Sequence, residues 1–209
     1  MDISRIMRQL NTMENINNSK MVIFEGLNSF SLPIRKNAMV HIYGGESTGK
    51  TTFVLDLIKK NPDKIFLYID TYGNIIHVPD NCFLFRTNKE KDIVEALENI
   101  DRNMVDCIII DSYSNILSEE ENWDSETHIV MQKTLERIHN IISNKNAVFI
   151  LINTLNGKGK AFNRNQYLSI NSICELELLN YDYDEKIIEV LPKKAIVRDL
   201  IHYSVSEEV

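Results

Sequence analysis

The residues best suited to chemistry form a glycine-rich run in the first quarter of the chain. They fit the phosphate-binding pattern G-x-x-x-x-G-K-[ST] at every fixed position, and they are Gly44, Gly45, Glu46, Ser47, Thr48, Gly49, Lys50, Thr51 and Thr52. Glycines allow a tight turn with inward-pointing N–H groups, and the dipole of a following helix points to the same place. Lys50 can reach the β- and γ-phosphates of a nucleotide, and the Thr51 hydroxyl can ligate Mg²⁺. The run predicts an ATP and Mg²⁺ site, against the alternative of a glycine-rich turn with no ligand.

A second candidate stands at the end of an apolar run. Residues 105–111 read Val-Asp-Cys-Ile-Ile-Ile-Asp, which predicts a buried parallel strand with Asp111 at its carboxyl end. A carboxylate in that place holds Mg²⁺ in P-loop proteins, so Thr51 and Asp111 are the candidate metal ligands. With Lys50 they make up the candidate catalytic set. The alternative is a strand that simply stops at an Asp-Ser turn.

Regular elements around these residues are expected to position them. Apolar runs predict strands at 38–43, 64–70, 82–85, 105–111 and 147–152. Apolar stripes at helical spacing predict helices at 50–60 and 125–143. A third helix is expected to start after the capping box at 87–90. This alternation predicts an α/β fold with right-handed crossovers and a mostly parallel sheet flanked by helices. No helix is expected beyond residue 143. Strands at 168–179, 186–191 and 195–205, with turns at 180–182 and 191–193, should form an antiparallel C-terminal extension.

The first 30 residues form a separate arm in this scheme. Residues 3–16 carry an apolar helical stripe, and residues 21–24 read as a strand. The arm, residues 1–30, either packs on its own domain or docks on a neighbouring subunit. Residues 31–209 form the core.

Composition limits the classes of function. The 209 residues are 44% hydrophobic and 25% charged, with no apolar run near the roughly 20 residues of a membrane span. The start of the chain has no secretory pattern, so we expect a cytoplasmic protein with no membrane partner. The three cysteines are widely spaced within apolar runs and are expected to be buried thiols. A net charge of −7 argues against a surface that coats nucleic acid, so any DNA contact must be local.

One loop is locally basic. Residues 154–167 hold Lys158, Lys160 and Arg164 without an acid, together with the aromatics Phe162 and Tyr167. Cations that follow phosphates and rings that stack on bases suit single-stranded DNA. The alternative is a solvated hairpin.

The phosphate-binding run, including its internal glutamate and doubled threonine, resembles the phosphate loop of bacterial RecA recombinases. Residues 105–112, 151–153 and 23–32 resemble further family segments, and the similarity extends over about residues 3–192. It implies a RecA-like P-loop NTPase core that binds ATP between subunits of a homo-oligomer or filament on single-stranded DNA. It also implies that Lys158, Lys160, Phe162 and Arg164 lie in a DNA-binding loop and that Thr154 stands where the family senses the γ-phosphate.

Two departures from the family pattern bear on activity. Tyr72 stands where the family has its water-activating glutamate, and a phenol is no carboxylate base at neutral pH. The acidic residues between 119 and 126 would repel DNA if they faced it. We therefore expect a weak DNA-dependent ATPase of recombination or repair, in a compact form of the kind a phage or mobile element would carry. The alternatives are a regulator that binds a true recombinase or replication partner, and a small-molecule P-loop kinase. A kinase would need an arginine-bearing lid, for which the basic loop offers only Arg164.

Overall fold

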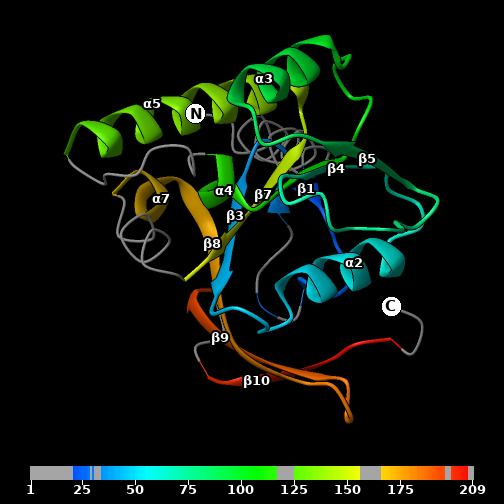
Figure 1. Cartoon of the computed structure of the whole chain (residues 1–209). Coiled ribbons are helices and arrows are strands. Elements are labelled where there is room, and N and C mark those ends of the chain that lie inside the picture. The colour runs from blue at the N-terminus through cyan, green and yellow to red at the C-terminus, as the bar shows by residue number, and fades with distance from the viewer. Residues whose placement is uncertain are drawn as a thin grey trace, which may run out of the picture.

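The computed structural model describes residues 21–28, 30, 34–116, 125–155, 166–195 and 199–206. Within these, one mixed eight-stranded sheet has the order β10-β9-β8-β3-β7-β6-β4-β5 (Figure 1). The strands are β3 (Met39–Gly44), β4 (Phe66–Asp70), β5 (Cys82–Arg86), β6 (Cys107–Asp111), β7 (Val148–Thr154), β8 (Ser172–Asp182), β9 (Ile187–Lys194) and β10 (Ile201–Ser204). All neighbours from β8 to β5 pair in parallel, and β9 and β10 pair antiparallel. The predicted α/β fold with an antiparallel C-terminal extension is confirmed.

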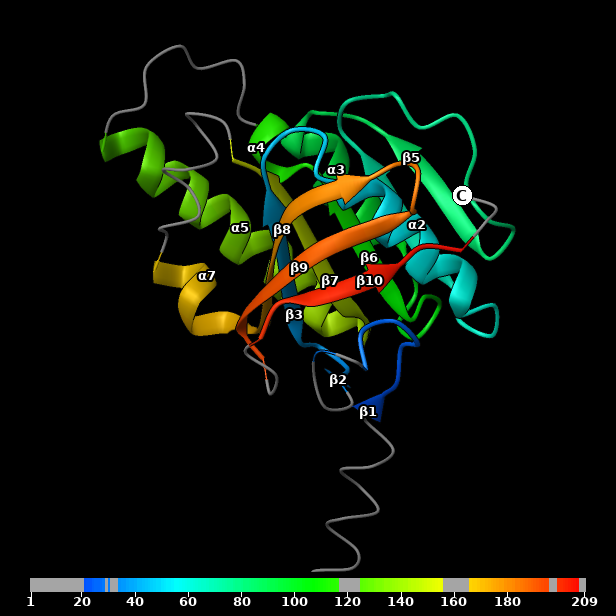
Figure 2. The ribbon, with the colours of Figure 1, turned by 90° about the horizontal axis from the view of Figure 1, so that it is seen from below.

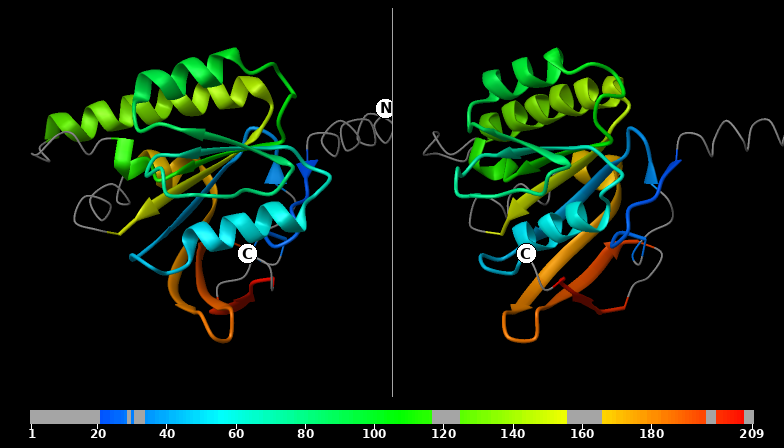
Figure 3. Two further views of the ribbon diagram at one scale, coloured as in Figure 1. Left: turned by 45° about the vertical axis from the view of Figure 1, so that its right-hand side comes forward. Right: turned by 90° about the vertical axis from the view of Figure 1, so that its right-hand side faces the viewer.

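Helices cover both faces of the parallel strands. Helix α2 (Lys50–Lys60) lies on one face, and α3 (Glu90–Asn99) and α5 (Ser125–Lys145) lie on the other (Figure 3). Successive side chains of a strand point to opposite faces, so β4 sends Phe66 and Tyr68 to the α2 side and Leu67 and Ile69 to the α3 and α5 side. Strands buried on both faces explain the nearly continuous apolar runs in the sequence.

Helix α2 is fixed by the apolar stripe that the sequence predicts. Phe53, Val54, Leu57 and Ile58 are fully buried against the sheet, and each contributes roughly 1.5–3 kcal/mol relative to an exposed side chain. Asn61 ends the helix, and its side-chain amide donates to the Leu57 carbonyl at 2.7 Å. The glycine-rich turn therefore leads into a rigidly packed helix.

The C-terminal part differs from the sequence-based expectation in four places. Among the described residues, the strand expected at 195–205 is limited to β10, Ile201–Ser204. Residues 166–171 form a short helix, α7 (Gln166–Asn171), so the prediction of no helix beyond residue 143 is wrong, and α5 itself continues to residue 145. The turn expected at 180–182 lies at 183–186, where Asp182 Oδ1 accepts the N–H groups of Asp184 and Glu185 at 3.0 Å. The turn expected at 191–193 does not form, and Pro192 lies within β9. A proline is tolerated there because the pairing of β9 with β10 ends at Val190 and the pairing with β8 shifts register beside Pro192.

The helix after residue 87 also begins differently. Its N-cap is Lys89, without a side-chain cap, rather than a Thr87 capping box. The Thr87 hydroxyl instead accepts the Lys89 N–H at 3.1 Å and donates to Asp92 at 3.0 Å. The apolar stripe of this helix faces the core: Ile93, Val94 and Leu97 are buried, and Ile100 is partly buried.

The last strand is attached to the middle of α2. Asp56 is fully buried and accepts the Tyr203 hydroxyl at 2.5 Å and the Ser206 N–H at 2.9 Å, and it pairs with Lys60 at 2.7 Å. Burial raises the pKa of Asp56, but these donors outweigh it and leave the pKa below its usual range. Figure 2 shows β10 running beneath α2 at this end of the sheet.

Part of the N-terminal segment packs on the same side. The strand expected at 21–24 is reduced to β1 (Met21–Val22), which pairs with β2 (Ile34–Arg35). Phe24 and Phe30 are buried in the cluster that contains Phe53 and Tyr203. The helix expected at 3–16 falls outside the described residues. All three cysteines are free and buried, as predicted, and none of the described helices is long and apolar enough to cross a membrane.

Candidate nucleotide-binding site

The phosphate-binding run forms the turn between β3 and α2. Gly44 ends the strand, and a Cβ there would collide with the Leu178 carbonyl of the neighbouring β8. Gly49 has φ +81°, and a Cβ there would lie 3.1 Å from Ile188 and Tyr181 of the β8–β9 hairpin. Gly44 is therefore required by the close approach of a neighbouring backbone, and Gly49 by its left-handed φ together with tight side-chain contacts.

The start of α2 is open to an anion. Its N-cap is Gly49 with no side-chain cap, and its first turn contains no acidic residue. Ser47 adopts φ +59°, a left-handed conformation that a non-glycine residue takes at a cost of about 1–2 kcal/mol. Uncapped N–H groups and local strain at a helix start are typical of phosphate loops.

Lys50 points back into the loop. Its Nζ donates to the Gly44 carbonyl at 3.2 Å and to the Gly45 carbonyl, and only 8% of the residue is exposed. Burial lowers the pKa of Lys50, while the nearby charges of Asp111 and Glu46 oppose that shift. The ammonium is held by weak neutral acceptors that a phosphate oxygen could replace.

Thr51 and Asp111 meet at the end of the turn. The Thr51 hydroxyl donates to Asp111 Oδ2 at 2.6 Å, and the Tyr68 hydroxyl donates to the same oxygen at 2.5 Å. Burial raises the pKa of Asp111, and the hydrogen bonds from Thr51 and Tyr68 partly oppose the shift. A buried carboxylate beside a hydroxyl is the oxygen donor set that Mg²⁺ prefers, so these residues fit that ion.

The strand end that carries Asp111 is held by the neighbouring strand β4. Thr71 N–H donates to the Asp111 carbonyl at 2.8 Å, and Ser112 N–H donates to Thr71 Oγ1 at 2.8 Å. Farther on, Ser114 N–H donates to Asn153 Oδ1 at 3.2 Å at the end of β7. These hydrogen bonds connect the carboxyl ends of the adjacent strands β4, β6 and β7 next to the site.

Asp70 occupies the matching position on β4 but has other partners. Its Oδ1 accepts the N–H groups of Tyr72 and Gly73 at 3.1 and 2.8 Å, and its Oδ2 accepts that of Ile75 at 3.0 Å. Arg86 lies 3.9 Å away. The carboxylate is used to shape the loop that carries Tyr72.

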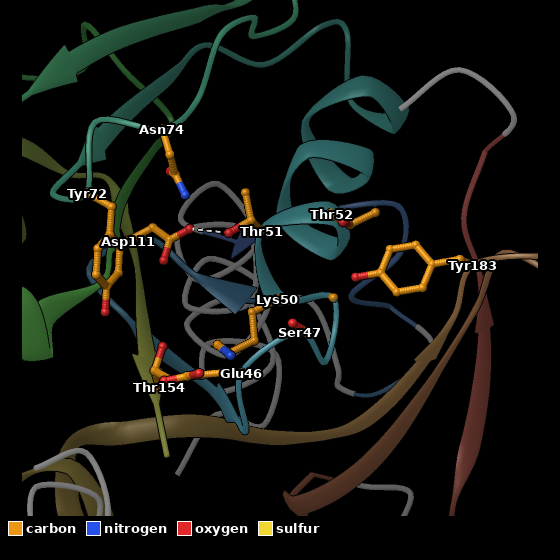
Figure 4. A pocket seen from close by; sticks show the side chains of 11 residues that line it. Glu46, Ser47, Lys50, Thr51, Thr52, Tyr72, Asn74, Asp111, Thr154 and Tyr183 are labelled. Atoms are coloured by element: carbon orange, nitrogen blue, oxygen red, sulfur yellow. Dashed lines mark hydrogen bonds between the residues drawn. The ribbon is translucent and has the colours of Figure 1, made fainter. Parts of the chain in front are cut away.

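A pocket of about 350 Å³ opens over these groups (Figure 4). Its lining residues come from five segments of the chain and are Glu46, Ser47, Gly49, Lys50, Thr51, Thr52, Tyr72, Asn74, Asp111, Thr154 and Tyr183. Tyr72 and Asn74 lie near Asp111, whereas Tyr183 lies on the far side of Thr52. The pocket is of a size suited to a small ligand and is lined by polar groups.

The structure brings most of the predicted site residues together. The residues of the phosphate-binding run that line the pocket face the same space as Asp111 and Thr154. The Thr48 hydroxyl does not line it but stabilises the turn by donating to the Gly45 carbonyl at 3.0 Å. The proposed DNA-binding residues Lys158, Lys160, Phe162 and Arg164 fall outside the described residues.

Three residues of the site were not predicted from the sequence: Tyr68, Asn74 and Tyr183. Tyr68 could have been found from its place on the strand beside β6, but no local signal marks Tyr183.

Comparisons with known proteins show a consistent relationship. No family model matches the chain. The chain is 28% identical over 175 residues to protein RecA of Mycoplasma genitalium, which covers 74% of this chain and 50% of that protein. It is 30% identical over 152 residues to protein RecA of Malacoplasma penetrans, covering 63% of this chain and 46% of that protein. Protein RecA of Leptospira meyeri is 29% identical over 138 residues, covering 57% and 36%. The chain therefore spans about half the length, or less, of the curated relatives it matches.

Proposed function

Because this chain is a RecA-like protein, we propose that it binds ATP with Mg²⁺ at residues 44–52 and acts in DNA recombination or repair. Bound nucleotide controls its affinity for single-stranded DNA, and the protein works as a homo-oligomer or filament. For the arm at residues 1–30, docking on the adjacent subunit is proposed only for the part before Met21, because Phe24 and Phe30 pack in this chain's own core. These statements go beyond the similarity, and the geometry of the pocket supports the part of them that concerns the nucleotide.

One observation carries the nucleotide assignment. The Thr51 hydroxyl and the Asp111 carboxylate come from elements 60 residues apart and meet at 2.6 Å beside an uncapped helix start. Magnesium bound there would neutralise the charge of the nucleotide phosphates. Lys50 supplies a positive charge to the β- and γ-phosphates, and the loop amides bind phosphate oxygens.

The position of Thr154 supports a link between nucleotide and DNA. Thr154 is the last residue of β7, is 8% exposed, and lines the pocket. The next residue, Leu155, donates its N–H to the Gly44 carbonyl at 2.7 Å, so the described chain just before the basic segment is bonded to the phosphate loop. A change in pocket occupancy that moves Thr154 also moves the start of the proposed DNA-binding loop.

The same pocket supports slow hydrolysis. Tyr72 lines it beside Asp111, and Asp70, which ends the neighbouring strand, is occupied by three loop N–H groups. The other carboxylate of the lining is Glu46, which belongs to the phosphate-binding run itself. A phenol does not act as a carboxylate base at neutral pH. This favours the second candidate function, a RecA-like regulator or mediator that binds ATP and a true recombinase but turns ATP over weakly.

Replacing Lys50 tests the nucleotide site. Lys50→Ala removes the cation directed at the phosphates, and we expect the affinity for Mg²⁺-ATP to fall by about 100-fold or more. Calorimetric titration measures it, with circular dichroism to establish that the variant is folded. Unchanged affinity would refute the assignment.

Replacing the basic residues of the loop tests the DNA function separately. In the triple variant with Lys158, Lys160 and Arg164 changed to Ala, we expect unchanged ATP affinity and a weaker, less salt-dependent binding of single-stranded DNA. Fluorescence anisotropy with a labelled oligonucleotide, with and without ATP, measures both effects. Equal DNA affinity would remove the loop from the proposal. ATP turnover with and without DNA then separates the recombinase from the regulator.

A further inference from the structure

Tyr183 is an exposed aromatic at the rim of the nucleotide pocket. It belongs to the β8–β9 turn, 65% of it is accessible, and it lines the same space as Thr52 (Figure 4). The lining contains one other aromatic among the described residues, Tyr72, which lies near Asp111. The two rings therefore mark opposite ends of the pocket.

The proposed phosphate contacts give the pocket a direction. Lys50 serves the β- and γ-phosphates, and the Mg²⁺ ligands Thr51 and Asp111 mark the end that receives the terminal phosphate. The ribose and base of a nucleotide must leave on the other side. Thr52 and Tyr183 lie on that side, and Tyr72 does not.

The ring of Tyr183 is supported from behind. The Tyr181 ring lies 4.3 Å from it, centroid to centroid, and Tyr181 itself lies against the phosphate loop at Gly49. The turn that carries Tyr183 is stabilised by Asp182, the last residue of β8, which accepts two backbone N–H groups. An exposed ring held on a braced turn can stack on a flat ligand without first being ordered.

The charges near Tyr183 fit a base and not a phosphate. The turn carries the acidic residues Asp182, Asp184 and Glu185, which would repel the phosphates of a nucleotide. A neutral base has no such penalty. Aromatic stacking with a base contributes to affinity and is strongest for large ring systems.

We propose that Tyr183 forms a stacking subsite for the base of a purine nucleoside triphosphate, with Tyr181 as its support. This inference rests on the proposed nucleotide site. It adds a residue that selects the nucleoside part of the ligand, on an element that the phosphate-binding pattern does not include.

The test compares two ligands that share the phosphate contacts. Mg²⁺-ATP has a base, and Mg²⁺-tripolyphosphate does not. For Tyr183→Ala, we expect the ATP affinity to fall by about tenfold while the tripolyphosphate affinity stays within twofold of wild type. The preference for ATP over CTP should also decrease. Tyr183→Phe keeps the ring and should behave like wild type, and Phe83→Ala removes an exposed aromatic of β5 outside the pocket as a matched control.

Each other result has a distinct meaning. An ATP affinity of Tyr183→Ala within twofold of wild type would overturn the inference. An equal loss for tripolyphosphate would also overturn it, because Tyr183 would then act through the shape of the phosphate loop. A wild-type protein that bound neither ligand would overturn the nucleotide site itself, and with it this subsite.

Discussion

Asp70 and Asp111 are the same residue type at the ends of neighbouring parallel strands, paired directly across the sheet. Both are nearly inaccessible, at 1% and 6% exposure. Asp70 accepts three backbone N–H groups of the loop that follows it. Asp111 accepts two side-chain hydroxyls, from Thr51 and Tyr68. Equal depth and equal position therefore lead to different partners.

The difference teaches how a buried carboxylate remains available to a ligand. Asp70 cannot release these amides without breaking three charge-assisted hydrogen bonds, one of which, from the Ile75 N–H, is buried. Hydroxyls rotate and can both donate and accept, so Thr51 can turn an oxygen toward a cation beside Asp111. Asp70 therefore stabilises the loop, and Asp111 remains able to bind a cation.

Asp111→Asn should have the largest effect on function. It removes the negative ligand for Mg²⁺ while keeping an acceptor for Thr51 and Tyr68, so we expect a loss of about 100-fold in Mg²⁺-ATP affinity, or about 2.7 kcal/mol. Stability without ligand should change little. Titration calorimetry measures the affinity, and wild type in EDTA serves as the matched state. A variant that binds like wild type would remove the distinction between the two carboxylates.

Asp70→Asn should affect stability instead. The amide places an N–H₂ group opposite one of the loop N–H groups and removes the charge that strengthens the other bonds. We expect the free energy of unfolding to fall by about 2 kcal/mol. Urea denaturation measures it. Since Tyr72 is carried by this loop, an altered turnover rate is also expected, whereas a stability equal to wild type would show that the loop amides find other acceptors.

The smallest expected effect is a pH dependence. Burial raises the pKa of Asp111 in the folded state, so the folded protein binds this proton more readily than the unfolded chain does. Between the ordinary carboxyl pKa of about 4 and the raised value, this group therefore lowers the free energy of unfolding as the pH rises. Denaturation in EDTA at several pH values measures the slope. In Asp111→Asn, the part of the pH dependence of the free energy of unfolding that comes from Asp111 should disappear. Identical slopes of this free energy against pH in the variant and the wild type would contradict the prediction.

Local patterns predicted the part of the fold where each element has its own signal. The glycine-rich run needs a strand before it and a helix after it, and the apolar run ending in Asp111 suits only a strand covered on both faces. These requirements hold whatever the rest of the chain does. The metal-side half of the pocket was predictable for that reason.

The rest depended on contacts between distant segments. Leu168 was expected in a strand, but it is buried in the core under α5 as part of a helix, and its apolar neighbours fit either structure. Pro192 signals a turn by its residue type, yet it is tolerated in a strand whose other side has lost its partner. Tyr183 reaches the pocket only because Tyr181 packs on Gly49, more than 130 positions earlier. No window of sequence contains that information.

The attachment of Asp56 to the last strand has a consequence for how the protein is made. The phosphate-loop helix is among the first core elements to leave the ribosome, and its buried carboxylate then lacks the Tyr203 hydroxyl and the Ser206 N–H. The carboxylate then keeps only its ion pair with Lys60 of the same helix. Burying a charge with too few partners is costly, so the packing of α2 against the sheet should be weaker until residues 201–206 arrive. Nascent chains should therefore gain a protease-resistant nucleotide site late, in the final stage of synthesis, and not when residues 44–52 first emerge.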